Sequence, residues 1–249
     1  MNQHYPAIHK LGRLPAKPAR MMLRNYVDLE RALPQVPDSV DNSHGQSIQL
    51  AIYLNTSIGD CTCAAVGNTL RVNSGGQQKI SDQDVLDAYV AITGIEGAAY
   101  DPQTGANDNG CVELDVLDYW AKTGVGGDKL VAHAGVDMSD PTEVKTFTWL
   151  CGALYIGVNL SVAQQQQETW DYVSGSPDWG GHAVPIFDIN PNRLGTWGAY
   201  KPFTDAFIAH QAEEGHALIT QAWLDANKDN PLIDLDALLT DFKSLEPEE

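Results

Sequence analysis

The stretch LNTSIGDCTCAAVGN, residues 54–68, places two cysteines one residue apart directly after an aspartate. Asp60 is a good helix N-cap, and small and apolar side chains follow it at helical spacing, so we expect a helix to open at Cys61. A cysteine at a helix N-terminus meets the positive end of the helix dipole, which favours the thiolate. The stretch is therefore a candidate metal site, redox pair, buried helix or catalytic nucleophile.

Helical patterns dominate the first half of the chain and strand patterns dominate the second. Amphipathic helices are expected in residues 80–94, 112–127 and 233–245. Further on, residues 144–161 change from helix to strand, residues 181–189 and 193–200 each form one strand, and residues 202–220 form a helix that stops at Gly215 and then a last strand.

A helical lobe followed by a strand-rich lobe is an α+β arrangement. We expect four parts. They are a basic, Pro-rich arm (1–46), a helical lobe with Cys61 (47–135), a β-rich lobe with His182 (136–224), and a C-terminal amphipathic helix with an acidic tail (225–249).

The net charge of −18 is unevenly distributed along the chain. The first 27 residues hold five of the 15 basic residues and no acid, which leaves 10 basic and 33 acidic residues in the remainder. A protein body with this much negative charge repels the phosphate backbone of nucleic acids, so we expect no nucleic-acid partner. The arm is expected either to lie across the fold as a solvated leader or to dock on acidic surface, with Leu14, Leu23 and Tyr26 as apolar anchors.

Neither a signal peptide nor an apolar run of membrane-spanning length is visible. We therefore expect a cytoplasmic protein with no membrane partner and with its four cysteines reduced. The oligomeric state cannot be read from these patterns.

Metal and cofactor motifs are missing from the sequence. Zinc sites use closely spaced ligand pairs, but the Cys-x-Cys has no second pair, Cys111 and Cys151 stand alone, and a glycine separates His210 from His216. The Gly- and Asp-rich loop before Cys111 lacks the calcium-loop spacing. Phosphate-binding loops and the Gly-x-Ser-x-Gly motif are also missing. We expect no cofactor and no metal.

Cysteine nucleophile chemistry fits better. It needs a thiol in an electropositive position, an imidazole that shares its proton, and a donor for the oxyanion. Cys61 supplies the first, and His182, at the start of a buried strand in DWGGHAV, supplies the second. Asn55, six residues before the cysteine, offers a side-chain amide as the third.

At these residues the chain resembles the papain-like cysteine peptidases along most of its length. The resemblance implies a helical N-terminal lobe packed on a mainly antiparallel β lobe. It also implies Cys61 as nucleophile, His182 as base, Asn55 in the oxyanion hole and Trp197 as the shield of the Cys–His pair. It rests on NTSIGDC, ISDQDVLDAY, DNGCVELDVLDYW, GHAVPIFDI and GTWGAY. Papain-like proteins of actinobacterial phages also share LGRLPA, N---GDC, GGHAV and TWG.

Several positions depart from the family pattern. The orienting Asn of the family falls on Gly195, so Asn192, Asn190, Asp188 or Thr196 takes its place, or the site works as a Cys–His dyad. Asn55 is shorter than the family's Gln. The charge of Asp60 should oppose the thiolate. Ile58 replaces the cysteine that would pair with Cys111, which should be free.

The expected function is hydrolysis of peptide, isopeptide or other amide bonds by a thiol protease, with polypeptides as substrates. The alternative is a non-catalytic structural or interaction protein of a phage, built on the same scaffold and located in the host cytoplasm or the virion.

Overall fold

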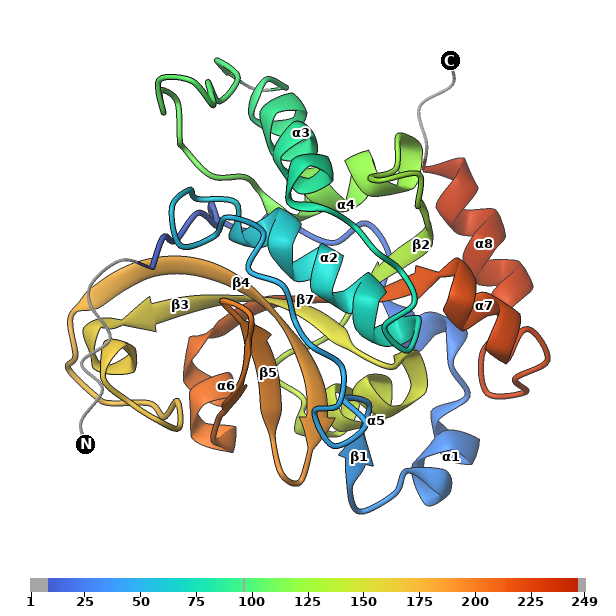
Figure 1. Cartoon of the computed structure of the whole chain (residues 1–249). Coiled ribbons are helices and arrows are strands. Elements are labelled where there is room, and N and C mark those ends of the chain that lie inside the picture. Colours follow the sequence, from blue (N-terminus) through green and yellow to red (C-terminus); the bar gives the residue numbers. More distant parts are fainter. Residues whose placement is uncertain (1–8, 96, 246–249) are drawn as a thin grey trace.

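The computed structural model describes residues 9–95 and 97–245 (Figure 1). Seven strands of this part form one antiparallel sheet in the order β2-β7-β3-β4-β5-β6, with β1 paired to β4. The strands are β1 (Val40–Asp41), β2 (Leu130–Gly135), β3 (Leu154–Ser161), β4 (Asp178–Ile189), β5 (Arg193–Thr196), β6 (Ala199–Pro202) and β7 (Ala212–Thr220).

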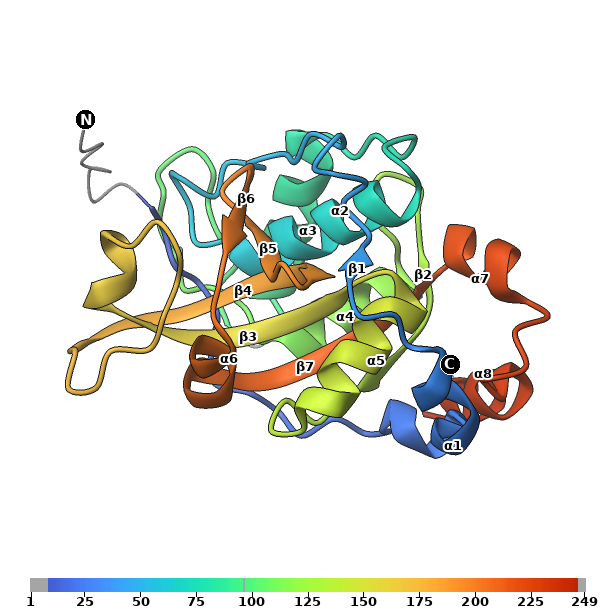
Figure 2. The same cartoon turned by 90° about the horizontal axis from the view of Figure 1, so that it is seen from below.

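Helices cover both faces of this sheet. Figure 2 shows α2 and α3 on one side of β3, β4 and β7, with α5 and α6 on the other. The α-helices are α1 (Leu29–Ala32), α2 (Cys61–Asn73), α3 (Asp82–Thr93), α4 (Glu113–Lys122), α5 (Pro141–Cys151), α6 (Asp205–Gln211), α7 (Gln221–Asn227) and α8 (Leu235–Ser244). Short 3₁₀ helices span Leu23–Tyr26, Leu33–Gln35 and Val162–Gln165.

Alternation along the strands divides the apolar residues into cores on opposite faces of the sheet. On β3, Leu154 and Ile156 belong to the core that contains α5, whereas Tyr155 between them belongs to the core of α2, α3 and α4. Successive side chains of a strand point to opposite faces, so one strand serves both cores. The structure confirms the expected α+β arrangement of a helical lobe packed on an antiparallel β lobe.

Helix α3 begins and ends where its capping residues predict, whereas α4 ends at Lys122, five residues before the end of the expected helix. Ser81 forms a capping box with Asp84 at the start of α3, and Gly94 ends that helix. The helix that opens at Cys61 is also confirmed, although Asp60, at its N-cap, accepts no capping hydrogen bond.

Two predicted elements are wrong in detail. Residues 193–200 form a hairpin rather than one strand, because Trp197 (φ 46°) and Gly198 (φ 76°) adopt the left-handed backbone that a tight turn requires. The helix expected to reach Gly215 ends at Gln211, and Gly215 lies inside β7. Pairing of β7 with strands on both sides supplies its backbone hydrogen bonds and overrides the local helical tendency.

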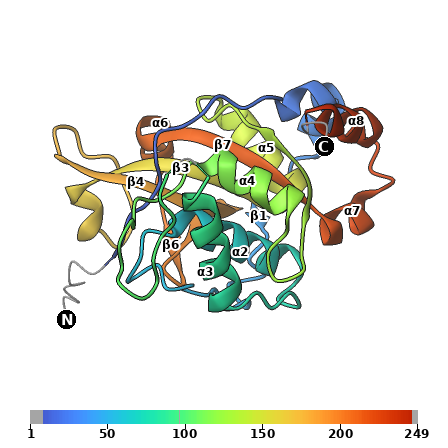
Figure 3. The same ribbon diagram turned by 90° about the horizontal axis from the view of Figure 1, so that it is seen from above.

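From His9 onward, the basic arm docks on the body rather than remaining solvated (Figures 1 and 3, dark blue); its first eight residues lie outside the described part of the chain. All five of its predicted cations pair with acidic residues: Lys10 with Asp108, Arg13 with Glu213 and Glu214, Lys17 with Asp115, Arg20 with Asp118, and Arg24 with Asp137 and Glu143. Leu23 is fully buried and the hydroxyl of Tyr26 donates to Asp241 at 2.8 Å, so both anchor the arm. Leu14 is 37% exposed and is not an anchor.

Among the described residues, no helix is both long enough and apolar enough to cross a membrane.

Candidate active site

Cys61 lies where the first turn of α2 meets β4. It is 1% exposed, and the backbone amides of Ala183 and Gly12 face its sulfur, where both favour the thiolate. Ala183 directly follows His182 on β4. The fold thus brings the predicted nucleophile against the strand that carries the predicted base, although 121 positions separate them in the sequence.

One ring nitrogen of the buried His182 imidazole has a polar partner, and the other has none within the part of the chain that the structure describes. Its Nε2 lies 2.8 Å from the hydroxyl oxygen of Thr196, and the ring of Trp197 stacks on it at 4.5 Å between centroids. Its Nδ1 is buried and has no hydrogen-bond partner among the described residues. One ring nitrogen is therefore anchored while the other is available to exchange a proton.

The hairpin of β5 and β6 supplies both neighbours of this imidazole. Thr196 is the last residue of β5 and Trp197 begins the turn, so the two side chains reach His182 from adjacent positions. Of the residues considered for orienting the histidine, Thr196 is the one that touches it. Trp197 covers the ring, as the sequence resemblance implies.

The other orienting candidates lie elsewhere. Asp188 is six residues from His182 on the same strand, roughly 20 Å along it, and is bonded to Ser43 and Arg193. Asn192 donates its side-chain amide to Asp205 at 2.7 Å. The polar groups of both residues stabilise turns and strand ends rather than the imidazole.

Asn55 and Asp60 line the loop that leads into α2. The amide of Asn55 is buried and donates to the backbone carbonyl of Ile58 at 3.2 Å. Asp60 is completely buried, and this burial holds the pKa of its carboxyl well above the usual range. The negative charge expected beside Cys61 is therefore disfavoured. A role in the oxyanion hole would require the Asn55 amide to leave its partner.

The arm passes through the junction of the two lobes directly over Cys61. Arg13 N–H donates to the carbonyl of Gly181 at 3.1 Å, and Cys111 N–H donates to the carbonyl of Gly12 at 2.8 Å. A Cβ atom on Gly12 would lie 1.7 Å from the carbonyl oxygen of Gly59. Only glycine fits this position of the arm, which leaves no room for another chain against Cys61.

Burial sets the protonation of the Cys61 thiol and of the His182 imidazole. It raises the pKa of Cys61 to about 12 and lowers that of His182 to about 3, and the charges of His9 and Arg13, both in the arm, lower the latter further. Thiol and imidazole are thus both neutral near pH 7. The low thiol pKa expected from the helix N-terminus is not found here, because desolvation outweighs the dipole.

All four cysteines are free and buried. The thiol of Cys63 shares a hydrogen bond with that of Cys111, so the residue two positions after the nucleophile packs inside the helical lobe. Sequence reasoning missed the contacts of Gly12 and Gly181. The glycine inside the leader LGRLPA was the only local sign of a close backbone contact. The leader's own residues do not indicate which part of the fold it contacts.

The comparisons with known proteins agree with this architecture. No family profile matches the sequence, and no curated protein is significantly similar to it. Among solved structures, xylellain, a cysteine protease from Xylella fastidiosa, is 16% identical with a TM-score of 0.68, over 86% of this chain and 97% of its own.

More distant cysteine proteases superpose as well. Procathepsin B S9 from Trypanosoma congolense is 12% identical with a TM-score of 0.60, over 85% of this chain and 87% of its own. Bromelain from Ananas comosus, in complex with the E64 inhibitor, is 13% identical with a TM-score of 0.52, over 74% and 99%. At such identities the likeness concerns the fold, and the chain has the fold of the papain-like cysteine proteases.

Proposed function

We propose that this protein is a papain-like thiol hydrolase that cleaves peptide or related amide bonds with Cys61 and His182. The observation that carries the proposal is the state of the imidazole. Its Nε2 is held by Thr196 and its Nδ1 lacks a partner within residues 9–95 and 97–245, while the backbone amide of Ala183, the next residue on β4, faces the Cys61 sulfur. Buried polar atoms without a partner are uncommon in folded proteins, and a catalytic role is one reason for such an exception.

The chemistry follows from this arrangement. Nδ1 of His182 takes the proton of Cys61, and the thiolate attacks the carbonyl carbon of the substrate. Thr196 then accepts the Nε2–H bond and steadies the imidazolium, which donates its proton to the leaving amine. Water hydrolyses the resulting thioester with His182 as base. The backbone N–H of Cys61 and the amide of Asn55 are the proposed donors to the oxyanion.

The docked arm makes the described state a latent one. A substrate carbonyl cannot approach Cys61 while Gly12 occupies the space above it. Withdrawal of the arm would admit water and remove the charges of His9 and Arg13, so the pKa values of Cys61 and His182 would move toward each other. Structures of procathepsin B and of a stem bromelain precursor are among those that superpose on this chain.

The test is hydrolysis of an unfolded protein by a chain whose arm is displaced. Gly12→Ala introduces a Cβ that collides with Gly59. Gly97→Ala serves as the control, because its Cβ would lie 3.8 Å from the nearest atom, an ordinary van der Waals contact. We expect turnover from the Gly12 variant. Cys61→Ala or His182→Ala added to that variant should abolish it.

A second function is supported by the same covered cleft. A neutral thiol and imidazole under a fully salt-bridged arm also suit a non-catalytic structural or interaction protein, the phage-related role suggested by the leader motif. In that case the Gly12 variant would release its arm, as judged by proteolysis, and still hydrolyse nothing.

A further inference from the structure

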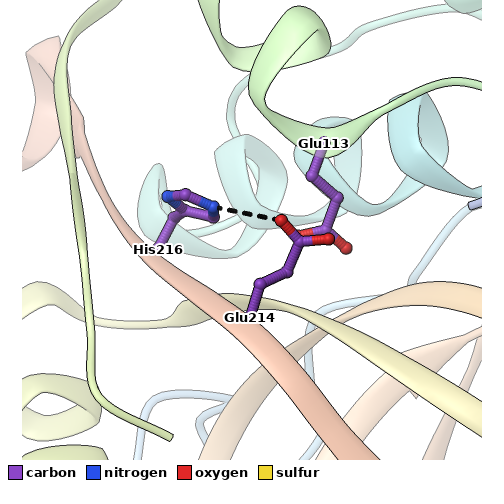
Figure 4. A group of neighbouring side chains, drawn as sticks. All are labelled: Glu113, Glu214 and His216. Atoms are coloured by element: carbon purple, nitrogen blue, oxygen red, sulfur yellow. Dashed lines mark ion pairs between the residues drawn. The ribbon is translucent and has the colours of Figure 1, made fainter. Parts of the chain in front are cut away.

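Three buried side chains converge behind Arg13, where the two lobes meet (Figure 4). Glu113 is the first residue of α4, while Glu214 and His216 are two positions apart on β7 and so share one face of that strand. One ligand atom from each lies within 4.8 Å of the others. Glu113 is 0% exposed, His216 1% and Glu214 8%.

Most polar atoms of this cluster have no hydrogen-bond partner in the described part of the chain. They are both carboxylate oxygens of Glu113, Oε2 of Glu214 and both ring nitrogens of His216. Buried carboxylates without donors are costly and rare in folded proteins. One unpartnered atom from each of the three residues faces the others, which indicates that a partner belongs between them.

The arm neutralises the cluster only in part. Arg13 donates from Nη1 to Oε1 of Glu214 at 2.8 Å and from Nη2 to Glu213, whereas it makes no hydrogen bond to Glu113. One guanidinium therefore faces three carboxylates, two of which are buried. A further positive charge is required for both buried carboxylates to be ionised.

The spacing of the unpartnered atoms fits a metal ion. Nε2 of His216 lies 3.7 Å from Oε2 of Glu214, which is too long for a hydrogen bond. Ligands about 2.0–2.2 Å from one tetrahedral ion lie about 3.3–3.6 Å apart. Arg13 holds the opposite oxygen of Glu214, as the outer partner of a ligating carboxylate commonly does.

A glycine on β3 also keeps side-chain atoms out of the cluster. Gly157 on β3 pairs with Glu214, and a Cβ atom there would lie 2.8 Å from Oε1 of Glu113. A surface cavity of about 480 Å³ is lined in part by Gly135, Glu214 and His216, so it borders the two β7 residues of the cluster.

We propose that Glu113, Glu214 and His216 bind one divalent transition-metal ion of the zinc class. The imidazole nitrogen among the ligands favours such an ion over magnesium or calcium, which prefer oxygen ligands alone. The ion joins α4 of the helical lobe to β7 of the β lobe and completes the charge balance beneath Arg13. It is a structural ion, separate from the Cys61–His182 pair.

The test uses the metal-stripped full-length chain. Equilibrium dialysis against Zn²⁺ should give one bound ion per chain, with a higher melting temperature. Co²⁺ should give visible bands of a four- or five-coordinate nitrogen–oxygen site without the near-ultraviolet sulfur-to-cobalt band that binding to the cysteines would produce. Glu113→Gln, nearly isosteric, should weaken Zn²⁺ binding at least tenfold, as should His216→Ala. His210→Ala, which changes an exposed histidine, should leave it unaltered.

Three results would overturn the site. They are binding of less than one equivalent by the wild-type chain, unchanged affinity in the Glu113 and His216 variants, and a sulfur-to-cobalt band. If His216→Ala does not fold, the cobalt spectrum of the wild-type chain and the affinity of Glu113→Gln decide the question. Neither depends on whether the protein hydrolyses peptides.

Discussion

Displacement of the arm by one methyl group is the sharpest perturbation that the structure offers. In Gly12→Ala the new Cβ would lie 1.7 Å from the carbonyl oxygen of Gly59. The oxygen belongs to the backbone and the position of Cβ is fixed by the backbone, so no side-chain rotation relieves the clash. The segment must leave the cleft. We expect Cys61 then to react with iodoacetamide at neutral pH, because only its thiolate is the nucleophile.

The size of the effect follows from the pKa of Cys61. At about 12 under the arm, only about one thiol in 10⁵ is ionised at pH 7, whereas a solvated cysteine with a pKa near 8.5 is about 3% ionised. The alkylation rate should therefore rise by about 3,000-fold. Proximity to His182, no longer opposed by the arm's cations, would raise it further.

The assay is a time course of alkylation at pH 7, with each cysteine quantified by peptide mass spectrometry. Cys63, Cys111 and Cys151 are buried in the lobes and serve as internal references that should stay slow. Gly97→Ala should behave as the wild type. The reasoning is refuted if Cys61 of the wild-type chain already reacts at the rate of a free thiol. It is also refuted if the Gly12 variant exposes its arm to protease while Cys61 remains as slow as the references.

Three more expectations concern the histidine and the arm. In the protein with its arm displaced, Thr196→Val should lower kcat by roughly tenfold or more with little change in KM. Nε2 of His182 loses its partner in this variant, and general acid–base catalysis contributes a factor of about 10²–10⁴ to the rate. Asn192→Ala is the matched control, and equal kcat values for the two variants would exclude the orienting role of Thr196. The pKa of His182 is about 3 when folded and about 6.5 when unfolded, so its contribution to stability is present above pH 6.5 and is lost as the pH falls toward 3. Urea unfolding of the wild type should show up to about 1.4 kcal/mol of loss per pH unit in that window, and a His182→Gln variant with an equally steep loss would contradict this. Arg13→Ala should lower the free energy of unfolding by about 3–5 kcal/mol, because it leaves a buried carboxylate unpaired. Arg20→Ala, which breaks a partly exposed ion pair, should lower it by under about 1 kcal/mol. Similar losses for the two variants would show that burial of the ion pair is not decisive.

Local signals predicted the elements that depend on local physics. The helices after Asp60 and Ser81 follow from capping residues and from apolar spacing, which act within one or two turns. The α+β order of the lobes and the Cys61–His182 candidates also came from the sequence, the former from its patterns and the latter from chemistry and family resemblance.

The choice of the residue that orients His182, among several similar polar residues, could be made only from the three-dimensional structure. Four polar residues near the lost family Asn were equally able to accept a hydrogen bond, and only the left-handed turn at Trp197 and Gly198 brings Thr196, rather than Asp188 or Asn192, to the imidazole. The sequence pattern predicts a continuous strand there, because a positive φ at a tryptophan is rare and residue type does not reveal it.

Only the tertiary structure decided what lies over Cys61 and what gathers behind Arg13. Charge composition predicted that a basic arm would meet an acidic body, but not that Gly12 would thread the cleft. Glu113 and Glu214 are 101 positions apart, and Glu214 was expected on a helix. In a strand, a shift of one residue sends each side chain to the opposite face. Whether Glu214 and His216 meet Glu113 therefore depends on the register of β7 with β3, which is set by cooperative pairing across the whole sheet and not by the residues themselves.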